Sequence, residues 1–260
     1  MSKKPRQTNP DPVELAVCAR DGASDERARA LAQRLHAPLV GSDELAGKLV
    51  VSVGQDGLAL EHEVLQMRAD LASMVPRVRH DRLGRELLVK AAKIKGHDGP
   101  LRAVDATAGL GQDALLLAAA GFETTLFEQN PVIAALLADS LERAARIPEL
   151  EGAIARMHFV EGDSIAGLHQ LAQPCDVVLL DPMFPERRKS ASVKKMFQLL
   201  HLLELPCADE EELLSAAFAA HPRKVVVKRP PKGPYLAGVK PSYSLDSKAV
   251  RYDVHVFARA

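Results

Sequence analysis

The stretch "LRAVDATAGLGQDALLLAAAG", residues 101–121, joins an apolar strand, a glycine turn and a helix. The apolar run ends in Asp105, and Gly109 and Gly111 allow a tight turn and a close approach of the backbone to a ligand. The pattern from Asp113 to Ala120 predicts a helix, whose first N–H groups and positive dipole end would face that ligand. The turn also satisfies a loose dinucleotide fingerprint, GxGxx(G/A), ending at Ala114, and an ordinary strand-to-helix turn remains an alternative.

Outward from this stretch, strand and helix patterns alternate. Helices are expected at 113–120, 131–145, 165–171 and 194–204, between the strand candidates "LRAVDAT", "ETTLFEQ", "RMHFVEGD", "DVVLLDP" and "KVVVKRP". The alternation predicts a doubly wound α/β sheet, and continuous apolar runs such as 177–180 suit its covered centre. The last stretch, 238–260, is too short for another crossover helix and predicts two antiparallel strands. A mostly parallel seven-stranded sheet that ends in an antiparallel hairpin is the layout of Rossmann-like class I S-adenosylmethionine (SAM)-dependent methyltransferases.

Three regions are expected along the chain. Residues 1–12 are polar and basic and predict a disordered tail, residues 13–78 a small N-terminal α+β lobe, and residues 79–260 the methyltransferase domain. In the lobe, "VELAVCA" is strand-like, Ser24 to Ala37 predicts a capped helix, and "KLVVSVGQDGLALEH" predicts a hairpin with Asp-Gly at its turn. A further helix is expected over 83–94, with Gly96 as its C-cap.

The composition is that of a globular chain, with 47% hydrophobic and 26% charged residues among 260. Apolar stretches are far shorter than the ~18 residues of a membrane span, and the start has no secretory h-region. The three cysteines are scattered without metal-ligand spacing, so we expect reduced structural thiols, no metal and a cytoplasmic location. A formal net charge of zero argues weakly against a nucleic-acid partner, but it conceals basic runs at 77–95, 183–200 and 221–240.

Acidic residues end the first three predicted strands of the sheet, at the edge where ligands bind in open α/β sheets. Asp105 would repel a pyrophosphate but could face the ammonium or sulfonium of SAM. Glu128 could accept hydrogen bonds from both ribose hydroxyls, although dinucleotide enzymes use such an acid too. Asp163 is expected to accept from the adenine amino group, with Ser164 contacting the base or capping the next helix; a simple turn is the alternative for both.

After the fourth strand comes Asp181-Pro182-Met183-Phe184. This resembles the (Asp/Asn/Ser)-Pro-Pro-(Tyr/Phe) motif of methyltransferases that act on amino groups conjugated to planar rings. Asp181 and the Pro182 carbonyl would accept the two N–H bonds of such an amine, and Phe184 would stack on the base. These three residues are the expected catalytic group, and a strand-terminal turn is the alternative. The motif has a second proline where this chain has Met183, and we find no physical reason for that difference.

The segments "VDATAGLGQDALLLAAAGFETTLFEQNPVIAALLADSLERA", "LLDPMFPERRKSASVKK" and "RKVVVKRP" together resemble the RsmJ family, bacterial 16S ribosomal RNA guanine-N2 methyltransferases. The resemblance covers roughly residues 79–257, while the first 75 residues match poorly. It implies SAM as cofactor and N2 of one guanosine in the small ribosomal subunit as acceptor. Family members tend to have Arg at the position of Gln112. Besides Asp105, Gly109 and Gly111, the implied SAM contacts are Gln112, Asp113, Glu128, Gln129, Asp163, Ser164 and Asp181.

Basic residues near the expected catalytic edge are candidates for phosphate contacts with 16S rRNA or the small subunit. For each run a solvated face is the alternative, and a monomer is expected. Three other functions remain open: methylation of a protein amide or small amine, a nucleotide-dependent dehydrogenase, and a non-catalytic RNA-binding module. The candidate RNA-binding residues are Arg187, Arg188, Lys189, Lys194, Lys195, Lys228 and Arg229.

Overall fold

A computed structural model describes residues 13–97, 99–182, 198–200, 202–203 and 209–258. The chain divides into two compact units, one running to Arg68 and the other beginning at Ala69. This boundary falls ten residues before the expected one at 78. Within the described ranges, no helix has both the length and the apolar character needed to cross a membrane.

The N-terminal unit contains a four-stranded sheet in the order β1-β2-β3-β4, with β1 parallel to β2 and the other pairs antiparallel. The expected hairpin is present, with Gly54 paired to Gly57 across the turn. Ser24 precedes helix α1 but makes no side-chain cap; its hydroxyl donates to Asp21 instead. The elements are β1 (Leu15–Ala19), η1 (Gly22–Ser24), α1 (Asp25–Arg34), β2 (Leu49–Gly54), β3 (Gly57–His62) and β4 (Leu65–Met67).

The second unit contains a seven-stranded sheet in the order β10-β11-β9-β8-β5-β6-β7, counted over its described residues. The strands from β9 to β7 are parallel, and β11 pairs antiparallel with both β9 and β10. This is the expected fold class, including the antiparallel end. The strands are β5 (Leu101–Asp105), β6 (Phe122–Glu128), β7 (Met157–Glu161), β8 (Val177–Leu180), β9 (Lys224–Arg229), β10 (Tyr243–Asp246) and β11 (Arg251–Val256).

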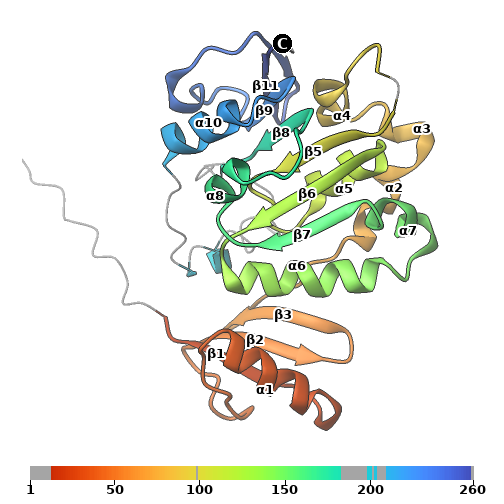
Figure 1. Ribbon diagram of the computed structural model, residues 1–260. Coiled ribbons are helices and arrows are strands. Elements are labelled where there is room, and N and C mark those ends of the chain that lie inside the picture. The colour runs from red at the N-terminus through yellow and green to blue at the C-terminus, as the bar shows by residue number, and fades with distance from the viewer. Residues whose placement is uncertain (1–12, 98, 183–197, 201, 204–208, 259–260) are drawn as a thin grey trace, which may run out of the picture. The chain divides into compact units, whose positions relative to one another are not determined.

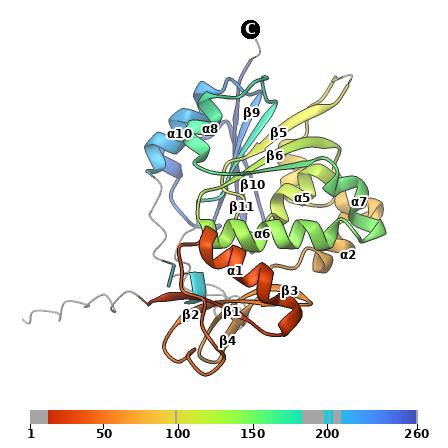
Figure 2. The same ribbon diagram turned by 60° about the horizontal axis from the view of Figure 1, so that its bottom comes forward.

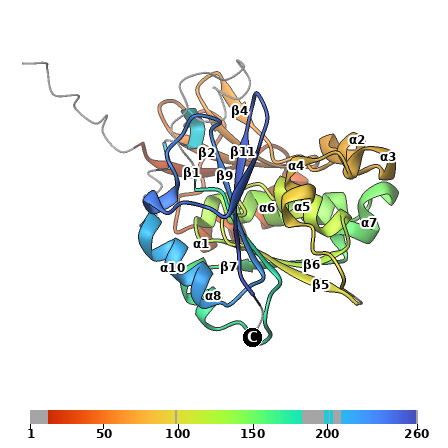
Figure 3. The same ribbon diagram turned by 90° about the horizontal axis from the view of Figure 1, so that it is seen from above.

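Helices cover both faces of this sheet (Figures 1 and 3). One apolar cluster joins one face to α4, α5, α6 and α7, and another joins the opposite face to α8 and α10. The helical segments are η2 (Ala72–Met74), α2 (Val75–Val78), α3 (His80–Leu83), α4 (Leu87–Ala92), α5 (Gln112–Ala119), α6 (Pro131–Ala144), α7 (Pro148–Ile154), α8 (Ser164–His169), α10 (Glu210–Ala219) and η3 (Leu236–Gly238).

The helix expected over 83–94 is interrupted, because Glu86 is extended (φ −61°, ψ 128°) between α3 and α4. Among the described residues, helices α2, α7 and α10 were not expected. Helix α10 is capped by Asp209, whose side chain accepts from the N–H groups of Glu211 and Glu212. The helix expected over 194–204 lies mostly outside the described residues. Figure 2 shows α5 and α6 from another side.

The chain reverses direction across the sheet beside β5. From β5 it proceeds outward to β6 and β7, then returns to β8 on the other side of β5. Val177, Val178, Leu179 and Leu180 of β8 are fully buried, as expected for a central strand. The loops that follow β5 and β8 therefore leave the same edge in opposite directions, which is where open α/β sheets bind ligands.

Candidate active site at the carboxyl edge of the sheet

The expected cofactor residues that the structure describes come from neighbouring strand ends of the second unit. Asp105 ends β5, Glu128 ends β6, and Asp163 follows β7 by two residues. Asp181 directly follows β8. Because these strands are parallel, their carboxyl ends share one edge of the sheet.

Asp105 is the most strongly perturbed of these acids. It is buried, with 1% of its surface exposed, and its Oδ1 accepts from the N–H of Thr107 at 3.1 Å. Burial, followed by the charges of Asp113 and Asp181, raises the pKa of its carboxyl to about 8, against the opposing effects of the Thr107 N–H and Lys228. Asp105 is therefore mostly protonated at neutral pH, and a cation brought beside it would favour its ionised form.

The glycine turn and Glu128 are joined by hydrogen bonds. The Gly109 N–H donates to Glu128 Oε2 at 3.0 Å, and the Asn130 N–H donates to Oε1 at 2.8 Å. Burial raises the pKa of Glu128, while these N–H donors oppose the shift. The carboxylate is thus fixed in orientation at the tip of β6, and each oxygen has a further lone pair for a hydroxyl donor.

The turn itself depends on left-handed backbone conformations. Gly109 has φ +53° and Gly111 φ +77°, a region that favours glycine. A Cβ on Gly111 would lie 2.6 Å from Leu137 Cδ1, whereas a Cβ on Gly109 would meet nothing within 4 Å. The side facing Gly109 is therefore open beside the first turn of α5, where Gln112 is exposed and Asp113 is half-buried.

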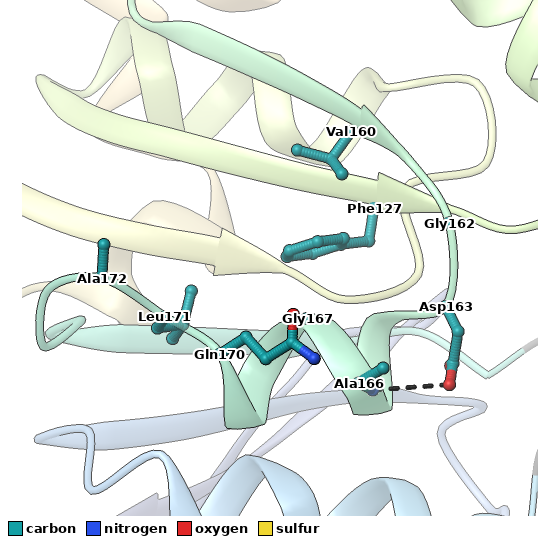
Figure 4. A pocket seen from close by; sticks show the side chains of 9 residues that line it. All are labelled: Phe127, Val160, Gly162, Asp163, Ala166, Gly167, Gln170, Leu171 and Ala172. Carbon is teal, nitrogen blue, oxygen red and sulfur yellow. Dashed lines mark hydrogen bonds between the residues drawn. The ribbon is translucent and has the colours of Figure 1, made fainter.

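Asp163 is the N-cap of α8. Its carboxylate accepts from the N–H groups of Ile165 at 3.0 Å and Ala166 at 3.4 Å. Asp163 also borders a pocket of about 350 Å³ between α8 and strands β6 and β7 (Figure 4). The pocket has an apolar wall that includes Phe127 and Leu171. Ser164 follows as the first residue of α8.

Asp181 is held through its backbone and its side chain. Its N–H donates to Thr107 Oγ1 at 2.6 Å, which ties the start of the post-β8 segment to the loop after β5. Its Oδ2 lies 2.8 Å from Lys228 Nζ, and the Asp181 side chain is 34% exposed. Pro182 is half-buried and is the last described residue of the motif. Phe184 lies outside the described residues, as do Arg187, Arg188, Lys189, Lys194 and Lys195.

The expectation that Lys228 and Arg229 contact RNA phosphates does not fit their surroundings. Lys228 lies within the candidate site, with Nζ 2.6 Å from Asp113 Oδ2 and 2.8 Å from Asp181 Oδ2. The Arg229 side chain is 0% exposed; its Nε donates to the Pro234 carbonyl at 2.8 Å and its guanidinium lies 3.5 Å from Glu210. Adjacent strand residues point to opposite faces, which separates these two cations.

The basic run around β9 does not form one patch either. Lys224 lies at the amino end of the strand, where its Nζ donates to the carbonyls of Ala91 at 2.9 Å and Lys93 at 2.7 Å. Arg223 pairs with Asp176 there, at 3.3 Å. These cations are at the opposite end of β9 from Lys228, so they are not at the candidate site.

Two residues of the site were missed from the sequence. Thr107 anchors Asp181, and Tyr252 pairs with Lys228 in the β9–β11 register. Burial and the nearby Asp113 carboxylate raise the pKa of Tyr252 well above its usual range. Neither residue belongs to a motif. The only available signal was position: Thr107 lies inside the turn, and Tyr252 near the start of the last strand.

The donor set fits SAM. A buried acid with a raised pKa, Asp105, suits a ligand that carries a cationic centre, and Glu128 offers two oriented oxygens to a ribose. The open side of Gly109 leaves space beside both. A pyrophosphate would place negative charge among Asp105, Asp113 and Asp181, which argues against a dinucleotide.

Comparison with known proteins agrees with this chemistry. Residues 34–257 match the family described as "Putative SAM-dependent methyltransferase". Ribosomal RNA small subunit methyltransferase J of Thioalkalivibrio sulfidiphilus is 44% identical over 89% of this chain and 93% of its own. The protein of the same name from Pseudomonas aeruginosa PAO1 is 42% identical over 93% and 94%. A crystal structure of a SAM-dependent methyltransferase from Neisseria gonorrhoeae has a TM-score of 0.70 and 31% identity, covering 93% of this chain and 95% of that one. The cofactor is therefore SAM.

We predict that Asp105→Asn stabilises the ligand-free protein in a pH-dependent way. The pKa of Asp105 is about 8 in the folded chain against an ordinary 3.8. As pH rises from about 4 to 8, the carboxyl ionises in the unfolded chain but stays protonated in the folded one, so the free energy of unfolding falls. The isosteric amide does not titrate and escapes this loss. Between pH 5 and pH 8, the advantage of the variant in free energy of unfolding should grow by at least about 1.4 kcal/mol, the equivalent of one pKa unit.

Urea titrations of both proteins at the two pH values measure this difference. Asp56→Asn, at an exposed carboxylate of the N-terminal unit, is the control and should show no such growth. An Asp105→Asn advantage that is the same at both pH values would contradict the raised pKa.

Proposed function

The chain belongs to the family of ribosomal RNA small subunit methyltransferase J proteins, and from this premise we propose that it methylates the exocyclic N2 of one guanosine in 16S rRNA. The observation that carries the proposal is the position of Asp181. It follows the central strand β8, is tied to Thr107 of the cofactor turn, and precedes Pro182. An amine acceptor bound there would lie beside the cofactor.

The amine must be activated, because the lone pair of an exocyclic amino group is delocalised into the purine ring. A carboxylate oxygen of Asp181 and the Pro182 carbonyl can accept its two N–H bonds, which returns electron density to nitrogen and directs the lone pair. Proline has no N–H to compete for these acceptors. We assign to Phe184, outside the described residues, the stacking of the flipped base.

When bound, SAM supplies an electrophilic methyl group on a sulfonium. The residues of this chain contribute position and electrostatics to the transfer. Asp105 would face the cationic part of the cofactor, Glu128 would hold the ribose, and Asp163 would accept from the adenine amino group. Asp181 would hold the acceptor amine beside the methyl group, and its carboxylate would take the proton that the nitrogen releases when the methyl group is transferred.

The RNA partner is supported by the names of the relatives, which share most of their length with this chain. These names specify ribosomal RNA, which favours RNA over a protein amide or a free amine, and such a substrate implies that the reaction takes place in the cytoplasm. The basic residues from Arg187 to Lys195 follow the amine-binding motif directly in sequence. We therefore retain them as the proposed contacts to the RNA backbone near the flipped base.

Two helix caps of the same kind allow the role of Asp163 in SAM binding to be separated from its role in folding. Asp163 and Asp209 each accept from two N–H groups at the start of a helix, α8 and α10. Changing either to Ala should cost about 1 kcal/mol of stability through loss of the cap. Only Asp163→Ala should weaken SAM binding, by about tenfold if one hydrogen bond to adenine is lost.

Calorimetric titration with SAM and urea unfolding measure the two effects. Equal SAM affinity in both variants would assign Asp163 to the cap alone.

The proposed reaction is tested with labelled SAM and small ribosomal subunits that lack the modification. The wild-type chain should incorporate one methyl group, recovered as N2-methylguanosine after digestion. Asp181→Ala should lower kcat by about 100-fold or more, because an amine acceptor placed in the transition state is removed. Asp246→Ala, at an exposed residue of β10, is the matched control and should remain within about threefold of wild type.

No incorporation by the wild-type chain, or incorporation that Asp181→Ala leaves unchanged, would contradict the proposal. A methyl group recovered on another atom of guanine would contradict the N2 assignment specifically.

A further inference from the structure

One lysine connects the cofactor side of the site to the acceptor side. Lys228, near the end of β9, has its Nζ 2.6 Å from Asp113 Oδ2 and 2.8 Å from Asp181 Oδ2. Asp113 lies in the first turn of α5, and Asp181 follows β8. The ammonium therefore joins three segments that are far apart in sequence but meet at the carboxyl edge of the sheet.

Lys228 supplies positive charge to a group of carboxyl side chains. Asp105 is a third carboxyl in the same group, and its pKa responds to Asp113, Asp181 and Lys228. Tyr252 of β11 also responds to the charges of this group, and the Asp113 carboxylate acts on Arg77 of α2 as well. Burial alone would lower the pKa of the Lys228 ammonium, but Asp113 and Asp181 hold it well above its usual range. Lys228 is thus a permanent cation among carboxyl groups that otherwise repel one another.

We propose that Lys228 is a positioning residue that sets the Asp181 carboxylate for the acceptor amine and links it, through Asp113, to the cofactor helix. The inference rests on the proposed function, because it takes Asp181 to be the amine acceptor. The Thr107 hydroxyl fixes the backbone of Asp181 at 2.6 Å, and Lys228 fixes its side chain. Both constraints act on the same residue, one from the loop after β5 and the other from β9.

The geometric requirement of the reaction explains the need for such a constraint. Asp181 is 34% exposed, and its ion pair with Lys228 opposes rotation of the carboxylate toward solvent. An in-line transfer to a weak nucleophile tolerates little displacement, and an error of about 1 Å can cost about 100-fold in rate. A partly buried pair at hydrogen-bond distance removes this freedom before the acceptor arrives.

The pair also connects the two ligands. Asp113 lies in the first turn of α5, just after the glycine turn. A ligand that moves this helix start therefore also moves the Asp113 carboxylate, which shares the Lys228 ammonium with Asp181. Binding or release of the cofactor would therefore change the position of the Asp181 carboxylate through its ion pair with Lys228. The consequence is that loss of Lys228 should affect the turnover step more than the binding of either ligand.

Lys224 offers a matched control on the same strand. It is a lysine of β9 with hydrogen bonds of its own, to the carbonyls of Ala91 and Lys93, at the end of β9 away from the site. Lys228→Met should lower kcat by about 100-fold, while KM for the RNA and the dissociation constant for SAM change by less than about fivefold. Lys224→Met should keep kcat within about threefold of wild type. Lys228→Arg, which retains the charge in a different shape, should give an intermediate kcat.

A carboxyl titration followed by carbon NMR provides a readout that needs no acceptor. Lys228 lowers the pKa of Asp105, which is about 8. In Lys228→Met that pKa should rise further, whereas Lys224→Met should leave it unchanged. Should Lys228→Met fail to fold, Lys228→Arg still tests the proposal, since it should preserve the pKa but not the full kcat.

A wild-type kcat in Lys228→Met would overturn the inference, as would equal losses of kcat in Lys228→Met and Lys224→Met. Absence of N2-methylguanosine with the wild-type chain is a different failure, that of the proposed function. In that case the carboxyl titration still tests the inference. An Asp105 pKa that is the same in Lys228→Met and in the wild type would show that Lys228 does not act electrostatically on the carboxyl groups of the site, which the positioning role requires.

Discussion

The pairing of β5 with β8 is the constraint on which the site depends. Residues 103–105 of β5 pair in parallel with residues 177–179 of β8, although about seventy residues separate them in the chain. This pairing aligns Asp105 with Leu179, two positions before Asp181. The cofactor turn and the amine-binding motif therefore leave the same edge of the sheet side by side, and the Thr107–Asp181 hydrogen bond closes the gap between them.

Several acids at this edge stabilise the fold and are also suited to bind ligands. Asp163 caps α8, and Glu128 joins the glycine turn to the start of α6. Asp105 does the opposite, because its buried carboxyl has a raised pKa and costs stability at neutral pH. A cost of this kind is typical of a site arranged for a charged partner rather than for the stability of the free protein. The ammonium of Lys228 limits that cost while no ligand is present.

The sheet could be predicted because its signals are local. Buried runs such as 177–180, the turn at Gly109 and Gly111, and acids at strand ends identify the parallel core, its binding edge and the candidate SAM residues before any contact is known. Contacts between distant residues could not be predicted. Lys228 looked like part of a basic run, yet its partner Asp113 is 115 positions away in sequence. Arg229 looked equally basic but is enclosed near Glu210, because a strand sends neighbours to opposite faces. Helices α7 and α10 were missed although each has a local start signal, Pro148 at the start of α7 and the capping Asp209 before α10.

Nucleoside mass spectrometry of 16S rRNA from a strain that lacks the gene tests the central claim most directly, since it reports the reaction, the atom and the substrate together. The account predicts that one N2-methylguanosine is lost from the small subunit and is restored by the wild-type gene, but not by one that encodes Asp181→Ala. An unchanged amount of N2-methylguanosine, or the loss of a methyl group at another atom or in another RNA, would contradict it.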